Sequence, residues 1–223
     1  MASAQDQSGQ AAKFWDKMAE GYFKKPISDL ESYQKKIEIT QSYLLPHMKL
    51  LEFGCGTGST SLLHAPLVKH ILATDVSSNM IEIAKKQAKQ KQIKNIDFMC
   101  ASVNSLIGTI PKSSMDAVLG LNILHLVEDR RNIIQETYNW LKPGGIFVTN
   151  TACINDMSIA PLFKLIAPVG IFFGLIPPVV ALSKDELMQE FKDAGFTIEQ
   201  EWRPRNSRSG KSDTVFIIGK KPE

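Results

Sequence analysis

The sequence predicts an α/β fold in which a mostly parallel, seven-stranded sheet is covered by helices on both faces. Short apolar runs alternate with segments whose apolar residues recur at helical spacing, as in repeated strand–helix units. Two of these runs end in an acid, Glu52 or Asp75, and a glycine-rich loop follows the first. Near the C-terminus, residues 196–202 and 214–219 alternate like the strands of a hairpin. We therefore expect a doubly wound sheet with an antiparallel terminal hairpin.

Length and composition limit the classes of protein. The chain has 223 residues, of which 43% are hydrophobic. We expect residues 11–223 to form a single domain with a full core. The net charge of +3 is small and the basic residues are scattered, so no nucleic-acid partner is expected. Three cysteines without C-x-x-C spacing argue against zinc and against a disulfide framework, and we expect no metal. Residues 1–10 are polar, which predicts a disordered tail, no signal peptide and cytoplasmic residence.

The elements follow in order along the chain. Residues 11–46 are predicted to form an N-terminal helical cap whose two helices end near Pro26 and Pro46. Strands are expected at residues 49–53, 70–74, 96–100, 117–121 and 146–149. The intervening helices begin near Gly58, at Ser77 or Ser78, and at Asp129, because serine and aspartate cap helix starts. Residues 142–145 (KPGG) predict a helix stop and a turn.

An apolar segment, residues 154–182, is predicted to form a lid. No residue from Leu165 to Leu182 is charged, a length that raises the question of a membrane span. Five prolines and glycines interrupt this stretch, so we expect a bent lid in which a helix would be poor. Ordinary packing, a wall for a hydrophobic acceptor and contact with a membrane surface remain open. Ser183 and Glu186 then form a capping box that opens the next helix.

The glycine spacing selects the kind of nucleotide. Dinucleotide-binding loops use G-x-G-x-x-G around a pyrophosphate, whereas here Gly54, Gly56 and Gly58 alternate. Glu52 stands two residues before the loop, where a carboxylate would repel a diphosphate but suits a ligand that carries an ammonium group. Asp75, about one strand–helix unit later, would accept hydrogen bonds from ribose hydroxyls. The pattern predicts a site for a cationic amino-acid nucleoside.

Several motifs together resemble class I S-adenosylmethionine-dependent methyltransferases of the small, ubiquinone-biosynthesis-like (methyltransferase type 11) kind. They are residues 14–19 (FWDKMA), 51–58 (LEFGCGTG), 75–77 (DVS), 116–118 (DAV) and 141–145 (LKPGG). The resemblance implies a Rossmann-like fold and S-adenosyl-L-methionine as cofactor, with S-adenosyl-L-homocysteine as product. It implies methyl transfer to a small acceptor but says little about which one.

The resemblance also implies a set of cofactor-binding residues. They are Tyr22, Glu52, Gly54, Cys55, Gly56, Gly58, Asp75, Val76, Met80, Ser102, Val103 and Asn122. Glu52 would lie near the methionyl ammonium, and Val76 and Met80 would sandwich the adenine. Ser102 stands where the family usually has Asp or Glu for the adenine amino group. A serine hydroxyl accepts more weakly than a carboxylate, so the backbone of Ser102 and Val103 would carry more of the recognition.

Methyl transfer from a sulfonium needs mainly an in-line approach and exclusion of water. A general base matters only where the acceptor must lose a proton, and His125 is the candidate. Its alternative is a buried structural histidine among leucines. The family builds its acceptor pocket in the lid, which implies an apolar acceptor that meets Phe163, Ile166, Phe172 and Phe173. Tyr33 resembles a family position that closes over the cofactor, and it is a further candidate substrate-binding residue.

The leading hypothesis is therefore O-, C- or S-methylation of a small or medium, apolar acceptor. No Asn/Asp-Pro-Pro-Tyr/Phe motif follows the fourth strand, which disfavours amino-group methylation of adenine or glutamine, and no Pro-Cys nucleophile is present for cytosine. Two alternatives stay open: a non-catalytic regulatory protein that binds S-adenosylmethionine, and a nicotinamide-dependent oxidoreductase. The sequence does not predict the oligomeric state.

Overall fold

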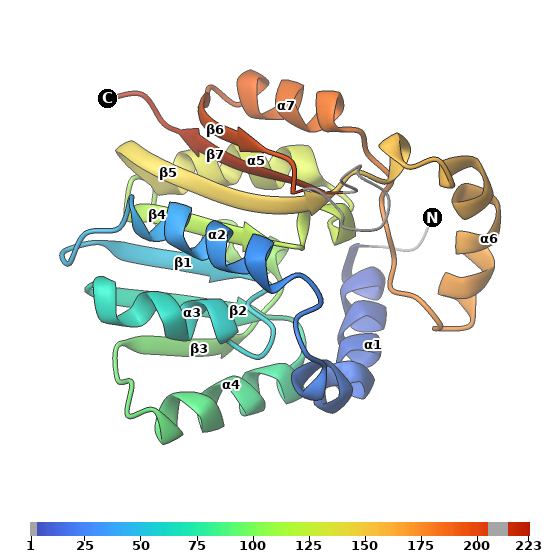
Figure 1. Cartoon of the computed structure of the whole chain (residues 1–223), viewed down its shortest axis with the longest axis horizontal. Helices are drawn as coiled ribbons and strands as arrows, with labels where there is room; N and C mark the ends of the chain where they lie inside the picture. Colours follow the sequence, from blue (N-terminus) through green and yellow to red (C-terminus); the bar gives the residue numbers. More distant parts are fainter. Residues whose placement is uncertain (1–3, 205–213) are drawn as a thin grey trace.

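A computed structural model describes residues 4–204 and 214–223. Its seven-stranded sheet has the order β3-β2-β1-β4-β5-β7-β6 (Figure 1). The strands are β1 Lys49–Phe53, β2 His70–Asp75, β3 Ile96–Cys100, β4 Met115–Leu121, β5 Leu141–Ala152, β6 Thr197–Trp202 and β7 Thr214–Lys220. β1 to β5 run parallel, and β7 pairs antiparallel with both β5 and β6. The predicted fold class is confirmed, while the basic tip between β6 and β7 lies outside the described residues.

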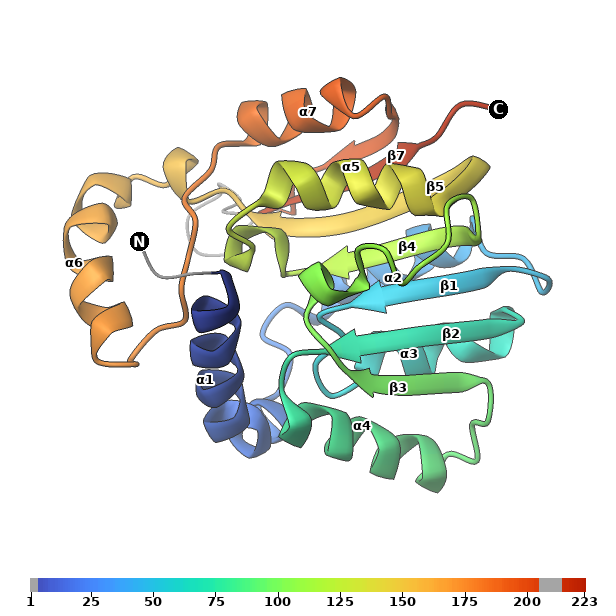
Figure 2. The same cartoon turned by 180° about the vertical axis from the view of Figure 1, so that it is seen from behind.

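Helices cover both faces of the sheet, with α2 and α3 on the face of Figure 1 and α5 on the face of Figure 2. Their bounds are α1 Ala4–Lys24, α2 Leu30–Gln41, α3 Ser59–His64, α4 Ser78–Gln90, α5 Arg130–Trp140, α6 Ala160–Phe172 and α7 Lys184–Asp193. The predicted caps form: the side chains of Ser77 and Asp129 accept hydrogen bonds from backbone N–H groups at the starts of α4 and α5. Both bonds of the Ser183–Glu186 capping box are present at α7.

The core lies in two layers, one on each face of the sheet. Successive strand residues point to opposite faces. Leu51 and Val118 therefore join one cluster with Phe147, while Leu50 and Leu119 join the other. The Phe147 ring stacks on Phe191 of α7 with centroids 5.1 Å apart. This two-sided burial fixes the register of β1 and β4, and so fixes which residues emerge at their carboxyl ends.

Three elements differ from the sequence-based expectations. α1 begins at Ala4 and so runs into residues 1–10, for which a disordered tail is predicted. Alanine and glutamine are good helix formers, and a helix that already exists extends easily into them. β5 begins at Leu141 rather than at residue 146. The predicted turn at 142–145 lies inside a strand irregularity, where Met115 pairs with Leu141 but Ala117 pairs with Ile146.

The third difference is the lid, where the expectation of a poor helix is wrong. α6 is a 13-residue helix that contains Pro168. Pro161 lies in the first turn, where the missing N–H would have no helical partner anyway, and only Pro168 removes an interior bond. Gly174, with φ +63°, follows the helix end as a left-handed stop. Of the helices that the structure describes, none is both long and apolar enough to cross a bilayer.

Candidate functional site

A cavity of about 440 Å³ opens at the carboxyl ends of β1, β2 and β4. The strand order reverses between β1 and β4, and ligands of open α/β sheets bind at such a point. The lining residues are Ala11, Trp15, Tyr22, Gly54, Gly56, Asp75, Val76, Met80, Ala101, Ser102, Val103, Asn104, Leu121, Asn122, Ile123, His125, Leu126, Val127, Glu128, Pro177, Pro178 and Val179. Most of the predicted cofactor-binding residues therefore meet in one cavity.

The glycine loop after β1 brings bare backbone to this cavity. Gly54, Gly56 and Gly58 all have positive φ, between +54° and +79°, which side-chain-bearing residues rarely adopt. A Cβ on Gly54 would lie 2.9 Å from Ile123, and one on Gly58 would lie 2.9 Å from Ala84. At Gly56 the nearest atom would be 3.9 Å away, on the Tyr22 ring. The loop is therefore closely packed on two sides and open to a ligand at Gly56.

Asp75 at the end of β2 presents a fixed carboxyl group to the cavity. One of its oxygens accepts a hydrogen bond from the Gly56 N–H (2.8 Å) and the other from the Ser77 N–H (2.9 Å). Each carboxylate oxygen can accept a second bond, so the group can receive two neighbouring ribose hydroxyls. Burial raises the pKa of Asp75, and the backbone hydrogen bonds oppose this shift. The geometry fits the predicted ribose contact.

Glu52 lies behind the glycine loop and does not line the cavity. Its side chain is buried and accepts a hydrogen bond from the Ser61 hydroxyl of α3. Burial raises the pKa of Glu52 from 4.5 to about 7, and the charge of Asp75 adds to this shift. A cation bound in front of the loop would favour the ionised form. The attraction between the Glu52 carboxylate and the ammonium group of the ligand therefore stays a prediction. It would act through space, without direct contact.

α1 closes one side of the cavity and is held there by Asp16, a residue that the sequence analysis did not single out. The Asp16 carboxylate accepts hydrogen bonds from the Ser77 hydroxyl (2.6 Å) and from the Asn79 N–H (3.1 Å). These bonds join α1 to the start of α4, next to Asp75. Trp15 and Tyr22 of the same helix line the cavity, with ring centroids 6.1 Å apart. The signal in the sequence that could have identified this role was the aspartate in the FWDKMA motif.

The predicted adenine end combines apolar walls with one capped turn. Val76, Met80, Ser102 and Val103 all line the cavity. The Ser102 hydroxyl accepts a hydrogen bond from the Ser105 N–H at 3.3 Å, and so caps the short 3₁₀ turn Val103–Leu106. This bond occupies part of the hydroxyl's capacity, which leaves the backbone groups as the stronger candidates for adenine contacts.

The opposite end of the cavity holds Asn122 and His125. Asn122 has φ +56° and accepts a hydrogen bond from the Asn150 side chain at 2.6 Å. The His125 carbonyl accepts a bond from the Val180 N–H at 2.8 Å, which ties the lid to this turn. Burial lowers the pKa of His125 to about 4, so its imidazole is neutral at pH 7. Its Nδ1 is buried and has no hydrogen-bond partner among the described residues.

The other predicted residues lie elsewhere. Cys55 and Gly58 belong to the loop but not to the cavity lining, and Tyr33 is on α2. The predicted acceptor residues Phe163, Ile166, Phe172 and Phe173 lie on α6 or directly after it, also outside the lining. The lid instead contributes residues 177–179. Their signal in the sequence was the Pro-Pro pair, which stiffens a segment without helix.

The charged and polar groups that line the cavity can be compared with what the predicted cofactor needs. No lysine or arginine is found among the described residues that line the cavity, so phosphates have no cationic partner there. Asp75, open backbone at Gly56 and apolar walls at Val76 and Met80 fit a nucleoside with a positively charged tail. Among the described residues, no three His, Cys, Asp or Glu side chains are grouped as metal ligands would be. Fold and site thus define a nucleoside-binding domain of Rossmann-like type.

Comparisons with known proteins agree with this class. Residues 51–149 match the model of a family described as a methyltransferase domain. Ubiquinone biosynthesis O-methyltransferase of Coxiella burnetii is 30% identical over 142 residues, which cover 62% of this chain and 57% of that protein. The protein of the same name from Xanthomonas campestris is 24% identical over 221 residues, 93% of this chain and 88% of its own length.

A solved structure extends the likeness in fold to nearly the whole chain. Geranyl diphosphate C-methyltransferase of Streptomyces coelicolor, in complex with Mg²⁺, geranyl diphosphate and S-adenosyl-L-homocysteine, superposes with a TM-score of 0.74 at 16% identity. The match covers 99% of this chain and 100% of that one. The motifs predict this likeness: residues 51–149 are similar to methyltransferase domains, and the solved structure, at 16% identity, extends the likeness in fold alone.

Proposed function

We propose that this protein transfers the methyl group of S-adenosyl-L-methionine to an oxygen, carbon or sulfur atom of a small, largely apolar acceptor. One observation carries the proposal: a single cavity joins a nucleoside end, at Gly56 and Asp75, to an apolar end at residues 126–127 and 177–179. The cofactor supplies an activated methyl group on a sulfonium when it is bound. Both reactants would then share one space from which water is largely excluded.

The residues of this chain act by binding, orientation and proton acceptance. Asp75 and the glycine loop would hold the nucleoside, while α1 and the lid cover the cavity from two sides. His125 is the proposed base, because its neutral imidazole at pH 7 can accept a proton from the acceptor. A pKa of about 4 makes it a weak base. Negative charge that develops on the acceptor would raise that pKa.

The names of the relatives narrow the acceptor class. The curated relatives are O-methyltransferases of ubiquinone biosynthesis, and the similar structure acts on geranyl diphosphate. A diphosphate acceptor needs cationic partners, and the described cavity residues include no lysine or arginine. A phenolic or thiol acceptor with an apolar body is therefore favoured over a prenyl diphosphate.

Calorimetric titration with S-adenosyl-L-homocysteine and with NADH tests the cofactor. We expect binding of the first and none of the second, and the reverse result would exclude the proposal in favour of a nicotinamide-dependent oxidoreductase. Assays with phenolic, thiol and prenyl acceptors, followed by mass spectrometry, test the transfer itself. Cofactor binding without a mass gain on any acceptor would favour the non-catalytic alternative.

The base role of His125 has its own experiment. His125→Gln should lower kcat by a factor of about 100 or more with little change in the Kd of S-adenosyl-L-homocysteine, since general acid–base catalysis contributes about that much. The matched control is His70→Gln, because His70 is half-buried on β2 and pairs with Asp97, away from the cavity. A rate within a few fold of wild type in His125→Gln removes the base role.

A further inference from the structure

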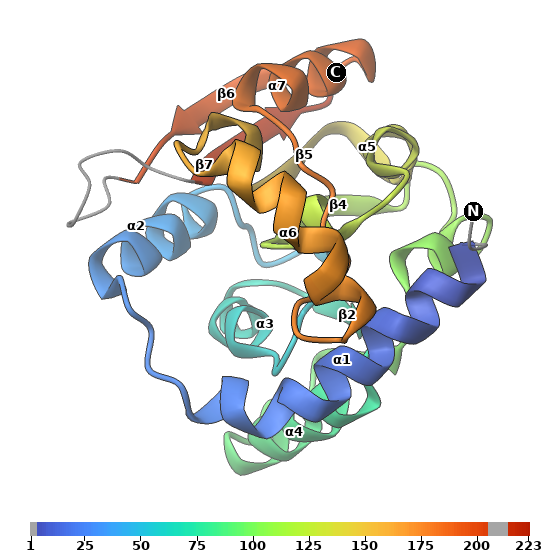
Figure 3. The same cartoon turned by 90° about the vertical axis from the view of Figure 1, so that its right-hand side faces the viewer.

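α6 and the turn after it expose a broad apolar surface, called here the α6 surface. Its members are Ile159, Leu162, Leu165, Ile166, Val169, Phe172, Phe173 and Leu175, each more than half exposed. Leu165, Phe172 and Leu175 reach 75%, 83% and 73%. α6 lies at the outer edge of the molecule, beyond α1 on the side where the parallel strands end (Figures 1 and 3). Monomeric proteins rarely expose so many neighbouring apolar side chains without a partner.

The α6 surface is wider than a helix–helix contact needs. With 3.6 residues per turn, its members within α6 spread over roughly 120° of the circumference. A two-helix seam buries only a narrow stripe. Ala160 and Ala167, on the other side of α6, are the buried residues that attach the helix to the protein. The outer side therefore fits a continuous apolar medium better than it fits one partner helix.

The charges in and around α6 also favour an apolar medium with an anionic surface. Between Asp156 and Lys184 the chain has no acidic residue, and Lys164 is its one cation. Lys164 makes no ion pair with any residue that the structure describes. A lysine on the rim of an apolar helix can extend its ammonium group toward anionic headgroups while its stem stays on the apolar side. The uncompensated charge is thus complementary to an anionic lipid surface.

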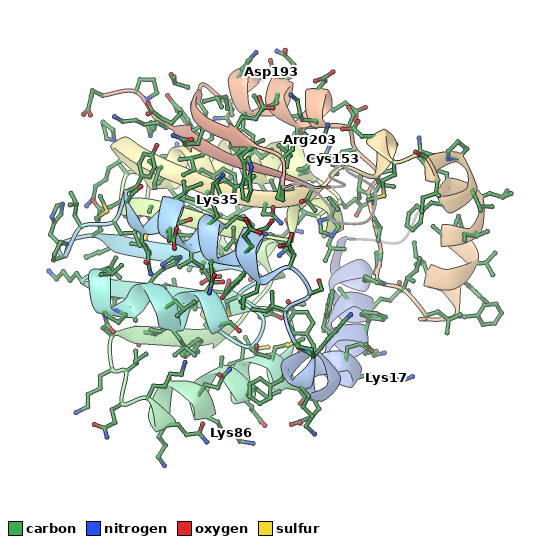
Figure 4. All side chains as sticks on the ribbon, viewed as in Figure 1. Lys17, Lys35, Lys86, Cys153, Asp193 and Arg203 are labelled. Carbon is green, nitrogen blue, oxygen red and sulfur yellow. The ribbon has the colours of Figure 1, made fainter. Side chains whose placement is uncertain are left out.

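The root of the lid is tied down, so α6 projects as one unit. Arg203 pairs with Asp156 at 2.7 Å, and the Asn155 N–H donates to the Leu182 carbonyl at 3.0 Å. Arg203 and Cys153 mark this root in Figure 4, where the side chains of α6 extend away from the sheet. From the far end of α6 the chain returns through residues 177–179, which line the cavity. The α6 surface and the apolar end of the cavity are therefore joined by a few residues.

We propose that the α6 surface lies in the interfacial region of an anionic lipid bilayer, and that the acceptor is a lipid-soluble molecule which reaches the cavity from that bilayer along the 177–179 segment. The second part rests on the proposed function. At 13 residues, α6 is shorter than the roughly 20 residues that a membrane-spanning helix needs, so its apolar outer side would lie in the interface and not across the bilayer.

Vesicle co-sedimentation tests the surface with the full-length protein. We expect wild type to bind vesicles of phosphatidylcholine and phosphatidylglycerol more strongly than vesicles of phosphatidylcholine alone. The double variant Leu165→Glu/Phe172→Glu should reduce the bound fraction of protein at least about tenfold, because each buried side chain of this size contributes more than a factor of ten. Leu63→Glu/Leu67→Glu is the matched control, since both leucines are exposed near α3 and lie outside the α6 surface.

Two further variants separate the electrostatic part of vesicle binding from the insertion of α6. Lys164→Glu should lose the preference for anionic vesicles while the weaker binding to neutral vesicles remains. Phe172→Trp should add fluorescence that brominated lipid quenches beyond the quenching of wild type, whose Trp15, Trp140 and Trp202 lie elsewhere. Equal quenching in the variant and in wild type would overturn insertion of α6.

The other outcomes are distinct. Wild type that stays in the supernatant with both vesicle types overturns the inference. So does a dimer that Leu165→Glu/Phe172→Glu converts to a monomer without any vesicle binding, because a second copy then covers the α6 surface. Calorimetry with S-adenosyl-L-homocysteine separates this test from the proposed function. Vesicle binding without nucleoside binding rejects the proposed function, and nucleoside binding without vesicle binding rejects only the inference.

Discussion

The carboxyl edge of the sheet and α6 differ in how their residues are held. At the edge, two carboxylates have specific partners: Asp75 accepts from two backbone N–H groups, and Asp16 fixes α1 against α4. On α6 most of the large side chains are apolar and exposed. The edge is preorganised for one ligand, because its groups are fixed before the ligand arrives. α6 suits a surface without specific geometry, since burial of apolar area is non-directional.

Each of the following changes tests this difference, beginning with the largest effect. Asp75→Asn should weaken S-adenosyl-L-homocysteine binding by about 3 kcal/mol, about a hundredfold or more in Kd, because two charge-assisted hydrogen bonds to the ribose are lost. The control is Asp97→Asn, an exposed acid on β3. Calorimetry gives both values, and a Kd for Asp75→Asn within threefold of wild type would contradict the ribose role.

Glu52→Gln should change the pH dependence of stability. Because burial raises the pKa of Glu52 from 4.5 to about 7, the folded protein holds this proton more tightly than the unfolded chain. This group therefore lowers the free energy of unfolding by about 3 kcal/mol as pH rises from 4.5 to above 7. The variant should lack that decrease, so its gain in stability over wild type should be larger at pH 8 than at pH 5. Urea denaturation at both values measures it, and an equal difference at both would contradict the burial argument.

Asp16→Ala should loosen α1 and so weaken nucleoside binding about fivefold to tenfold, since a hydrogen bond to a charged group contributes about 1.5 kcal/mol. Hydrogen exchange should increase in α1 and not in the sheet. Glu20→Ala is the control on the same helix, because Glu20 pairs with Lys24 at the surface. Unchanged exchange in α1 would show that Asp16 does not hold the helix.

On α6 the expected effect on stability is small. Leu165→Ser should change the free energy of unfolding by less than about 0.5 kcal/mol, because the side chain is already in contact with solvent. Leu119→Ala, in the core of β4, should cost about 2–5 kcal/mol. Denaturation in the absence of lipid compares the two. A large loss in Leu165→Ser would mean that α6 packs against the protein through this residue.

Ser102→Asp is the smallest predicted effect. Aspartate caps a helical turn as well as serine does, and it accepts hydrogen bonds from an adenine amino group more strongly. The Kd of S-adenosyl-L-homocysteine should therefore stay within about twofold of wild type or decrease. A large loss of affinity by calorimetry would show that the loop after β3 is aligned wrongly with the family.

The strands and caps could be read from the sequence because their signals are local. The ranges 49–53 and 96–100 agree with β1 and β3, and Ser77, Asp129 and Ser183 cap the helices as predicted. Glycine adopts positive φ readily, and a carboxylate brings negative charge to its surroundings. The glycine spacing and the two acids at strand ends could therefore be interpreted from the residue types directly. Pro168 led to the wrong expectation for the lid, because an otherwise complete helix tolerates the loss of one hydrogen bond.

By itself, the sequence determined the order of strands and helices outside the lid and the turn at Gly54, Gly56 and Gly58, and it predicted the class of nucleoside, because these depend on near neighbours. Only the tertiary structure decided which lid residues reach the cavity, that Asp16 anchors α1, and that Phe172 and its neighbours face outward. An apolar side chain has the same composition whether it faces a core, a pocket or a membrane. Its environment depends on the path of the whole chain around it.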